Sequence, residues 1–447
     1  MSTAAIKKNK TREVAVKCYL SISSGNVFIQ DSLNKAFKNY KFKPRDKAFL
    51  SEMLFGAVKM KRRIDFVLDK FVEQELSPWT EACLRLGLYQ MMFSGGTPDY
   101  AAVNEFVELT AKHDNPGAAS LVNAVLRRYQ RESEKIEYPG FDIDPVGHLG
   151  LYHSLPDWLV KSWINFYGKI DALALAEHAN SRSLPSLRLF SLNRRKPNFK
   201  EMEDSGFIPH EYFDGYFTYT GKGDPRDKDI YKRNFVYFQD PSAGMAVKLS
   251  GAKVGDYIFD IGAAPGGKTI NLYEAIQGKG KITAIEANQG KLTGLKKNLY
   301  RMGIKTVNII GKDVQDFHVR RRGDVVLVDV PCSGLGTLSR NADLRWRIEP
   351  QEISSYATQQ REILQAASNL VKPGGRLIYS TCTISDPENR GVVNSFLADN
   401  PNFVRANTSA AVYNLKRESV TVEGDLLILP FHYNTDGAFV SVMRRMK

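Results

Sequence analysis

Cysteine is scarce in this chain, and the motifs built on it are missing. Only four cysteines occur among 447 residues: Cys18, Cys83, Cys332 and Cys382. They are too few and too scattered for a disulfide framework, which excludes the class of small disulfide-stapled secreted proteins. No C-x-x-C pair exists, so we expect no zinc site and no other metal centre. The four thiols are expected to be free, and a free thiol can act as a nucleophile.

Long apolar runs are also missing. No stretch approaches the roughly 18 uninterrupted apolar residues that a membrane span needs. Lys7 and Lys8 are not followed by an apolar run, so the N-terminus does not resemble a signal peptide. We therefore expect a cytoplasmic protein with no membrane association, and we expect it to be a monomer.

Positive charge, by contrast, is abundant. The chain has 62 lysines and arginines against 49 acidic residues, a net charge of +13. Such an excess favours a polyanionic partner such as RNA, although a role in solubility would give the same net charge. Part of the excess is clustered in three runs: residues 35–47, 59–63 and 320–322.

Hydrophobic periodicity divides the chain into three regions. Residues 1–132 show the spacing of packed helices, with Leu50, Met53 and Leu54 on one face. Cys18 and Cys83 lie in this region among apolar residues, so we expect both to be buried and inert. Residues 133–237 begin with a polar linker and continue as a small α+β subdomain, with one strand expected at 187–193. We assign both regions to RNA binding.

The third region, residues 238–447, alternates short β-branched runs with helical stretches. We expect strands at residues 257–260, 282–286, 307–310, 325–329, 377–380, 426–429 and 439–442. This pattern predicts a doubly wound, Rossmann-like α/β domain, which binds ligands at the carboxyl ends of its strands. Asp260, Glu286 and Asp329 each end one of these strands, so they should line one crevice.

A glycine-rich loop follows the first of these strands. Its small residues allow a ligand to approach the backbone, and the next helix presents free N–H groups. Residues 262–269 also match the Walker A pattern G-x-x-x-x-G-K-T, so a P-loop NTPase acting on nucleic acid is an alternative. Against it, Glu286 suits the ribose hydroxyls of a nucleoside cofactor. The dehydrogenase fingerprint G-x-G-x-x-G is absent, which weakens the case for a nicotinamide cofactor.

Two cysteines at strand ends point to a different chemistry. Cys332 follows Asp329 closely, and Cys382 follows the strand at 377–380, so both should face the cofactor crevice. A phosphate-transfer site has no use for them, whereas a thiolate can add to the 6-position of cytosine and make the 5-position nucleophilic. Lys268 is the cation available to ionise such a thiol. Asp329 is placed to hydrogen-bond the ring nitrogen and exocyclic amine of the base.

At these residues the chain resembles the NOL/NOP/Sun family of RNA cytosine methyltransferases. The resemblance covers nearly the whole chain and is strongest to the bacterial RsmB (Sun, Fmu) type, which acts on small-subunit (16S) rRNA. It implies an N-terminal NusB-like RNA-binding domain and a class I methyltransferase domain. Its marks are residues 86–90, 102–105, 122–127 and 238–243, the Pro-Cys and Thr-Cys motifs, and the C-terminal stretches 429–432 and 435–439.

The resemblance also implies a cofactor and roles for residues. Cys382 is expected to be the nucleophile, and Cys332 to assist release of the methylated product. S-adenosylmethionine is the expected cofactor, contacted by Gly262, Ala263, Ala264, Pro265, Gly266, Gly267, Lys268, Glu286, Asp313 and Asp329. The chain departs from the family pattern at Gly262, Glu286, Val330 and Ala342, which removes no reactive group.

The leading interpretation is therefore an RNA cytosine-5 methyltransferase, with rRNA as substrate and tRNA as the alternative. A P-loop NTPase predicts ATP binding through Lys268, with both cysteines dispensable. A catalytically silent RNA-binding scaffold, such as an antitermination or ribosome-assembly factor, also predicts that both cysteines are dispensable. The paired cysteines favour the methyltransferase.

Overall fold

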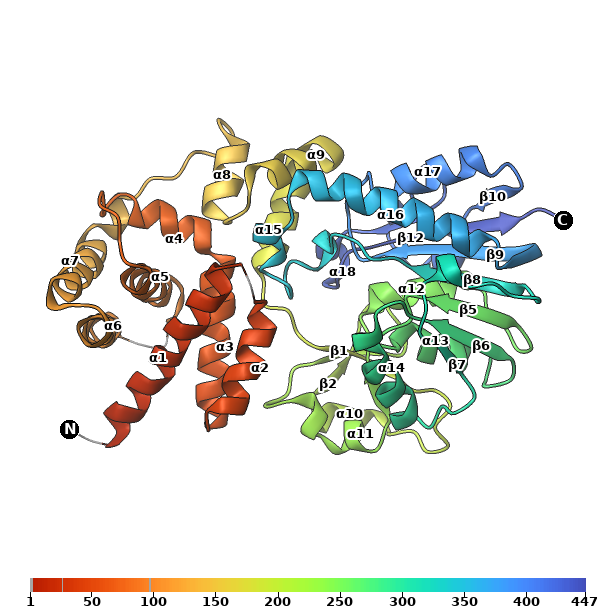
Figure 1. Cartoon of the computed structure of the whole chain (residues 1–447), viewed down its shortest axis with the longest axis horizontal. Helices are drawn as coiled ribbons and strands as arrows, with labels where there is room; N and C mark the ends of the chain where they lie inside the picture. Colours follow the sequence, from red (N-terminus) through yellow and green to blue (C-terminus); the bar gives the residue numbers. More distant parts are fainter. Residues whose placement is uncertain (1–2, 26, 96–97) are drawn as a thin grey trace. The chain divides into compact units, whose positions relative to one another are not determined.

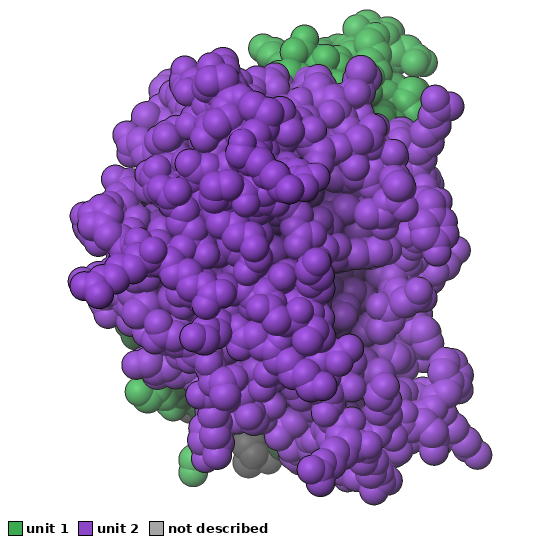
Figure 2. All heavy atoms as spheres, turned by 90° about the vertical axis from the view of Figure 1, so that its right-hand side faces the viewer, with its two compact units in different colours: residues 1–180, 341–347 green, residues 181–340, 348–447 purple. Residues whose placement is uncertain are grey.

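The computed structural model describes residues 3–25, 27–95 and 98–447, apart from the side chains of residues 3–10. Two compact units make up the chain, and Figure 2 distinguishes them by colour. Unit 1 comprises residues 1–180 and 341–347, and unit 2 comprises residues 181–340 and 348–447. No helix in the described ranges is both long and apolar enough to cross a bilayer.

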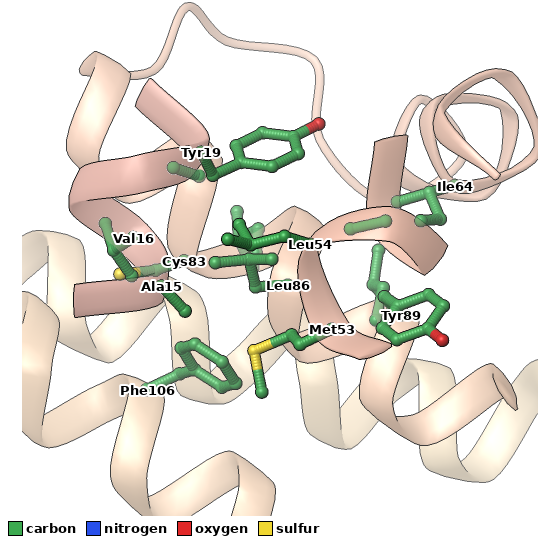
Figure 3. Packing of buried hydrophobic residues seen from close by; sticks show 14 of the residues in the cluster. Ala15, Val16, Tyr19, Met53, Leu54, Ile64, Cys83, Leu86, Tyr89 and Phe106 are labelled. Atoms are coloured by element: carbon green, nitrogen blue, oxygen red, sulfur yellow. The ribbon is translucent and has the colours of Figure 1, made fainter. Parts of the chain in front are cut away.

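Unit 1 is built of helices, as the periodicity predicted. Their bounds are α1 Thr3–Ser23, α2 Ile29–Asn39, α3 Pro44–Lys59, α4 Lys61–Leu68, α5 Pro78–Phe93, α6 Asp99–His113, α7 Pro116–Glu132, α8 Pro145–Tyr152, α9 Asp157–Asn180 and α15 Leu344–Arg347. Several begin at a proline behind a capping side chain, as where Asn115 accepts the N–H of Ala118. The apolar faces of α1 to α7 meet in one core, shown in Figure 3, where Met53, Leu54 and Cys83 are buried.

The helices α8 and α9 belong to unit 1, although the sequence assigned residues 133–180 to the linker and subdomain. Polar contacts to α4 tie them there. The Arg62 guanidinium donates to the carbonyl of Leu155 and pairs with Asp157, at 2.5 and 2.6 Å. The neighbouring Arg63 stacks its guanidinium carbon 4.0 Å from the centroid of the Tyr152 ring. The basic run at 59–63 is thus engaged in packing, unlike the exposed run at 35–47.

Residues 341–347 return from the second half of the chain into unit 1. Ala342 is fully buried in its core, and the indole N–H of Trp346 donates to the Val58 carbonyl at 2.7 Å. The guanidinium of Arg345 is also fully buried. It donates to backbone carbonyls and one side-chain amide, at Lys59, Ser154, Ala179 and Asn180. This short segment is therefore part of the core of unit 1 and is hydrogen-bonded to its helices.

Unit 2 contains a small antiparallel sheet in the order β2-β3-β1-β4. Its strands are β1 Ser186–Leu189, β2 Phe207–Pro209, β3 Tyr216–Tyr219 and β4 Val236–Phe238, flanked by α10 Phe199–Asp204 and α11 Asp229–Lys232. The strand expected at 187–193 is confirmed but ends early. After Phe190 the chain leaves the sheet, because the Ser191 N–H donates to the Glu274 carboxylate, at 2.5 Å, and to no neighbouring strand.

The larger sheet has the order β10-β12-β9-β8-β5-β6-β7, with β11 paired to β12. Its strands are β5 Tyr257–Ile261, β6 Lys281–Ile285, β7 Asn308–Ile310, β8 Gly323–Asp329, β9 Val371–Thr381, β10 Phe403–Ala406, β11 Leu426–Ile428 and β12 Ala438–Arg445. The strands β5 to β9 run parallel, and β12 is antiparallel to both of its neighbours in the order. All seven strands predicted here are present, and β10 was missed.

Helices cover both faces of this sheet (Figure 1). Alternate residues of a strand point to opposite faces, and both sets are apolar. Val325 and Leu327 pack with α12 Pro241–Ser250 and α13 Gly267–Ala275, whereas Val326 and Val328 pack with α16 Pro350–Ser368 and α17 Arg390–Asp399. The helix α14 Gln289–Arg301 joins the first layer through Leu295. The short α18 Pro430–Tyr433 precedes β12. The Rossmann-like class is confirmed.

Strand register aligns the carboxyl ends of the central strands. Ile261 of β5 lies opposite Ile285 of β6 and Val328 of β8, and Asp329 lies opposite Ser380 of β9. The loops that leave these strands therefore start side by side. They are the glycine loop at 262–267, the Pro-Cys loop that contains Pro331 and Cys332, and the Thr-Cys loop that begins at Cys382.

Candidate active site

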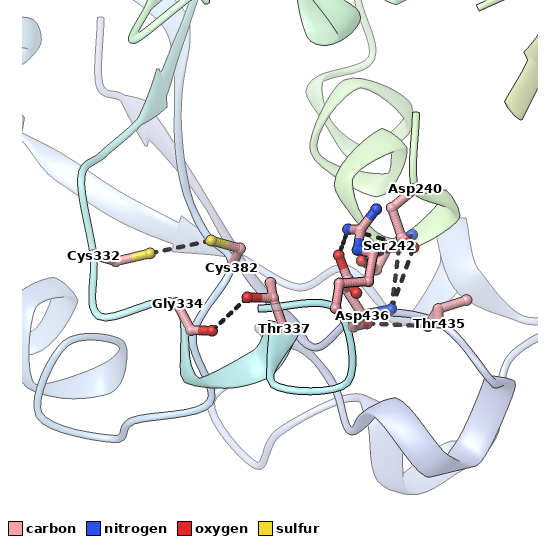
Figure 4. Close-up of polar contacts among 9 residues, drawn as sticks. Asp240, Ser242, Cys332, Gly334, Thr337, Cys382, Thr435 and Asp436 are labelled. Carbon is pink, nitrogen blue, oxygen red and sulfur yellow. Dashed lines mark hydrogen bonds and ion pairs between the residues drawn. The ribbon is translucent and has the colours of Figure 1, made fainter. Parts of the chain in front are cut away.

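Two cysteines meet where β8 and β9 end. Cys332 lies three residues beyond β8, and Cys382 directly follows β9. Their sulfur atoms are 3.3 Å apart (Figure 4). Cys332 is half-buried and Cys382 is exposed, so the second thiol is open to a substrate. Cys18 and Cys83, in contrast, are buried in unit 1, and burial raises the pKa of Cys83 to about 11.

The pKa values of the two neighbouring thiols are shifted in opposite directions. A hydrogen bond from Cys332 lowers the pKa of Cys382, and the cations of Lys268 and Arg340 lower it further, against burial and Asp329. The pKa of Cys332 is raised well above its usual range by that same hydrogen bond, by burial and by nearby negative charge. Cys382 is therefore the more readily ionised thiol of the pair, which suits a nucleophile, and Cys332 holds its proton more tightly.

Lys268 and Asp329 form an ion pair next to the thiols. The ammonium nitrogen lies 2.8 Å from a carboxylate oxygen of Asp329. Burial alone lowers the pKa of Lys268, but the charge and hydrogen bond of Asp329 outweigh burial and raise it. Lys268 thus stays a cation. The sequence predicted both residues at this site, and the structure brings them together.

The sequence did not single out Arg340, which forms a second cationic group beside Cys382. Its guanidinium pairs with Asp436 and lies 4.0 Å from a carboxylate oxygen of Asp240. The backbone N–H of Asp436 donates to the same Asp240 carboxylate (Figure 4). Two stretches noted separately in the sequence, 238–243 and 435–439, therefore meet at Arg340.

The glycine loop is held against the end of β6. The N–H groups of Gly262 and Ala263 donate to the Ile285 carbonyl, at 3.0 and 3.2 Å. The N–H of Ala264 donates to the Glu286 carboxylate at 3.2 Å. Gly266, whose φ of +107° favours glycine, then leads into α13. The first turn of α13, which follows this loop, therefore faces the crevice.

Comparisons with known proteins identify the family. A family model described as 16S rRNA methyltransferase RsmB/F matches residues 248–444, and a NusB family model matches residues 9–131. The chain is 30% identical over 444 residues to the probable ribosomal RNA small subunit methyltransferase B of Synechocystis sp., covering 97% of this chain and 99% of that one. The chain belongs to the RsmB/F family.

Other similarities of this RsmB/F chain extend over its full length. It is 29% identical over 452 residues to the Bacillus subtilis protein described as probable ribosomal RNA small subunit methyltransferase B, covering 98% of this chain and 100% of that one. The solved structure named PH0851 shares its fold, with a TM-score of 0.78 and 24% identity over 98% of this chain and 99% of that one. The NusB type of the N-terminal helices rests on the family model that matches residues 9–131.

S-adenosylmethionine is the cofactor of this family, and the crevice has groups that fit it. Glu286 is almost fully buried at the end of β6, and among the described residues each carboxylate oxygen accepts one backbone N–H, from Ala264 or Asn288. Each oxygen can therefore accept a further hydrogen bond from a ribose hydroxyl. Asp313 follows β7 at the same edge and is half-buried. A buried oxygen of Asp260 has no hydrogen-bond partner among the described residues.

The RsmB/F assignment overturns the P-loop alternative, and the loop explains why the pattern misled. The Thr269 hydroxyl, in the Walker position for a metal ligand, is buried and donates to Asp260 at 2.5 Å. Lys268, in the phosphate-binding position, is paired with Asp329. Both groups are thus committed to carboxylates. The silent-scaffold alternative is likewise unsupported, because the family is one of methyltransferases and the two thiols lie together beside a cation.

Proposed function

We propose that this chain methylates the 5-position of a cytosine in small-subunit (16S) ribosomal RNA, through a covalent adduct on Cys382. The carrying observation is the pair of thiols 3.3 Å apart, one lowered and one raised in pKa, beside the Lys268–Asp329 ion pair. The relatives described as ribosomal RNA small subunit methyltransferases support rRNA over tRNA as the substrate. An rRNA substrate also places the enzyme in the cytoplasm.

Cys382 starts the reaction. Its thiolate adds to the 6-position of the ring, and the electron pair of the 5,6 double bond then makes the 5-position a carbon nucleophile. S-adenosylmethionine, when bound, supplies an electrophilic methyl group. Asp329 accepts a hydrogen bond from the exocyclic amine, and from the ring nitrogen once that is protonated. Lys268 keeps the carboxylate oriented and favours the thiolate of Cys382.

Cys332 acts in the release step. The proton on the 5-position leaves to the sulfur of Cys332 once that thiol is ionised; the electron pair of the broken carbon–hydrogen bond re-forms the 5,6 double bond, and the bond from carbon 6 to sulfur breaks. Cys382 then leaves as a thiolate. Cys332 lies within hydrogen-bond distance of that sulfur, so it is placed to assist this elimination.

Binding roles follow the same arrangement. We assign cofactor contacts to the glycine loop of Gly262, Ala263, Ala264, Pro265, Gly266 and Gly267, together with Lys268, Glu286, Asp313 and Asp329. The target base must leave its stack to reach a thiol, which costs a few kcal/mol and less in a loop. The exposed basic run at 35–47 and the small sheet subdomain are the proposed RNA-binding parts.

Two cysteine variants test the proposal. With S-adenosylmethionine and unmodified rRNA, Cys382→Ala should give no methylated RNA and no adduct. Cys332→Ala should retain attack but lose release, so a protein–RNA adduct should accumulate and survive denaturing electrophoresis. A buried thiol provides the control, since Cys18→Ala should leave turnover unchanged. Normal turnover by Cys332→Ala without any adduct would contradict these roles.

A further inference from the structure

A buried acidic side chain lies behind the two cysteine loops. Glu388 is fully buried in unit 2, six residues after Cys382 and just before α17. Burying a carboxylate is costly unless hydrogen bonds compensate it. Each of its oxygens has donors on at least one loop that carries a catalytic cysteine.

The first loop is held through the residue next to Cys332. The Glu388 carboxylate accepts the backbone N–H of Ser333 at 2.9 Å and its hydroxyl at 2.5 Å. It also accepts the side-chain amide of Gln360 at 3.1 Å, and that amide donates to the Pro331 carbonyl at 2.9 Å as well. The residues on both sides of Cys332 are therefore connected to one carboxylate.

The second loop is held from the same side chain. The Thr383 hydroxyl, next to Cys382, lies 3.3 Å from a Glu388 oxygen and 2.8 Å from the Ser333 hydroxyl. The hydroxyl of Tyr379, in β9, donates to the Glu388 backbone carbonyl at 2.6 Å. The side chain of the adjacent Asn389 instead bonds to the Thr381 hydroxyl and the Thr383 carbonyl, both on the side of the second loop. Glu388 thus bridges the two loops, whereas its neighbour secures one.

We propose that Glu388 is a positioning residue that ties the two cysteine loops together and sets the Cys332–Cys382 spacing needed for product release. The proposal rests on the covalent function proposed above. Release needs both thiols near the same cytosine ring, because the proton leaves its 5-position while Cys382 departs from its 6-position. Attack needs Cys382 alone. Loss of the bridge therefore slows release more than attack.

The charge of Glu388 gives a second effect. It acts with Cys382 and burial to raise the pKa of Cys332. The other titratable groups facing Cys332 are Tyr356 and Tyr379, and those facing Cys382 are Asp329, Lys268 and Arg340. Because a negative charge disfavours a thiolate, its removal lowers the pKa of Cys332. The pH midpoint of the release step should then move to lower pH, which a purely structural role would not cause.

Two variants separate these effects, each assayed by single-turnover kinetics that resolve adduct formation from product release. Glu388→Gln keeps the size of the side chain and should move the release midpoint to lower pH. Glu388→Ala removes the bridge and should slow release by about tenfold or more, with adduct accumulating, while adduct formation changes far less. Glu362→Gln, on the exposed surface of α16, removes one acidic charge and should match the unmodified enzyme.

Folding is checked by the affinity for S-adenosylmethionine. Should Glu388→Ala fail to bind it, Ser333→Ala carries the same test, since it deletes the two hydrogen bonds of its hydroxyl, to Glu388 and Thr383, and keeps the carboxylate. Release at an unchanged rate and pH midpoint in these variants overturns the proposal, and so does equal slowing of attack and release. Failure of the covalent function is distinguishable, because Cys332→Ala would then form no adduct whatever the Glu388 variants do.

Discussion

Lys268 interacts with two anionic partners in the crevice. Its ammonium pairs with Asp329 at 2.8 Å, and its charge lowers the pKa of Cys382. Arg340 also lowers the pKa of Cys382, whereas burial and the charge of Asp329 raise it. The thiolate fraction of Cys382 at neutral pH is thus set by a balance of two cations, one carboxylate and the neighbouring thiol.

Loss of the Lys268 charge should move adduct formation to higher pH. Because the cation favours the thiolate, Lys268→Gln raises the pKa of Cys382, and attack then requires a higher pH. A shift of one unit reduces the rate at neutral pH by about tenfold. The measurement is the single-turnover rate of adduct formation against pH at saturating S-adenosylmethionine. Lys279→Gln, at an exposed position, is the control, and an unchanged midpoint in Lys268→Gln would refute the assignment.

Chemistry at single residues was only partly predictable from the sequence. Cys332, Cys382 and Lys268 could be found, because each belongs to a motif that follows a recognisable strand. Arg340 and Glu388 could not be found, because a charged residue in a loop carries no periodic signal. In the sequence it cannot be distinguished from a charged residue exposed to solvent. Their importance comes from contacts with residues that lie far away in the sequence, such as Asp436 and Ser333.

Among the elements, the segment 341–347 is the least expected. Arg345 is fully buried with no carboxylate among its hydrogen-bond acceptors, and burial lowers its pKa to about 9. Its donors satisfy carbonyls at the end of α3, after α8 and at the end of α9. Carbonyls at the end of a helix have no partner within that helix, and the guanidinium supplies one. The segment therefore holds together helices that the sequence placed in different regions.

Removal of this guanidinium should destabilise unit 1. Arg345→Ala leaves buried carbonyls without donors and opens a cavity, so the free energy of unfolding should fall by about 3 kcal/mol. All four tryptophans, Trp79, Trp158, Trp163 and Trp346, belong to unit 1, so tryptophan fluorescence during urea unfolding follows this unit alone. The exposed Arg45→Ala, also in unit 1, should change it by less than about 0.5 kcal/mol. Equal midpoints for the two variants would contradict this account.

Elements were predictable where the pattern was strong. The parallel strands read as continuous apolar runs because both faces are covered by helices, and every one was found. The strand β10 was missed because Phe403–Ala406 is short and includes an arginine, and it pairs only with β12. The boundary at residue 132 was placed at a polar linker, yet α8 and α9 continue unit 1, because contacts such as Arg62–Asp157 are invisible in local sequence.

At the scale of the whole molecule, the net charge of +13 divides into structural and available parts. The basic run at 59–63 is half-buried and engaged in ion pairs and ring contacts. The lysines and the arginine between residues 35 and 47 are exposed on α2, α3 and the turn between them. Charge that is exposed to solvent can replace the counterions of RNA. The exposed run is therefore the part of unit 1 expected to bind the substrate.

Charge removal from α2 should weaken RNA binding in a salt-dependent way. Lys35→Ala with Lys38→Ala should lower affinity for rRNA and reduce the slope of log K against log salt by ~0.7 for each lost phosphate contact. Affinity for S-adenosylmethionine should not change. Binding is measured by fluorescence anisotropy at several salt concentrations. The matched control is Lys161→Ala with Lys169→Ala, two exposed positions on α9, and equal losses in both pairs would rule out a specific role for α2.

The most direct test of the central claim is transfer of a labelled methyl group. The full chain is incubated with methyl-labelled S-adenosylmethionine and unmodified small-subunit rRNA, and the RNA is digested to nucleosides. Label is expected in 5-methylcytidine, and none is expected when Cys382 is replaced by alanine. Label in another nucleoside, or undiminished transfer by Cys382→Ala, would contradict it.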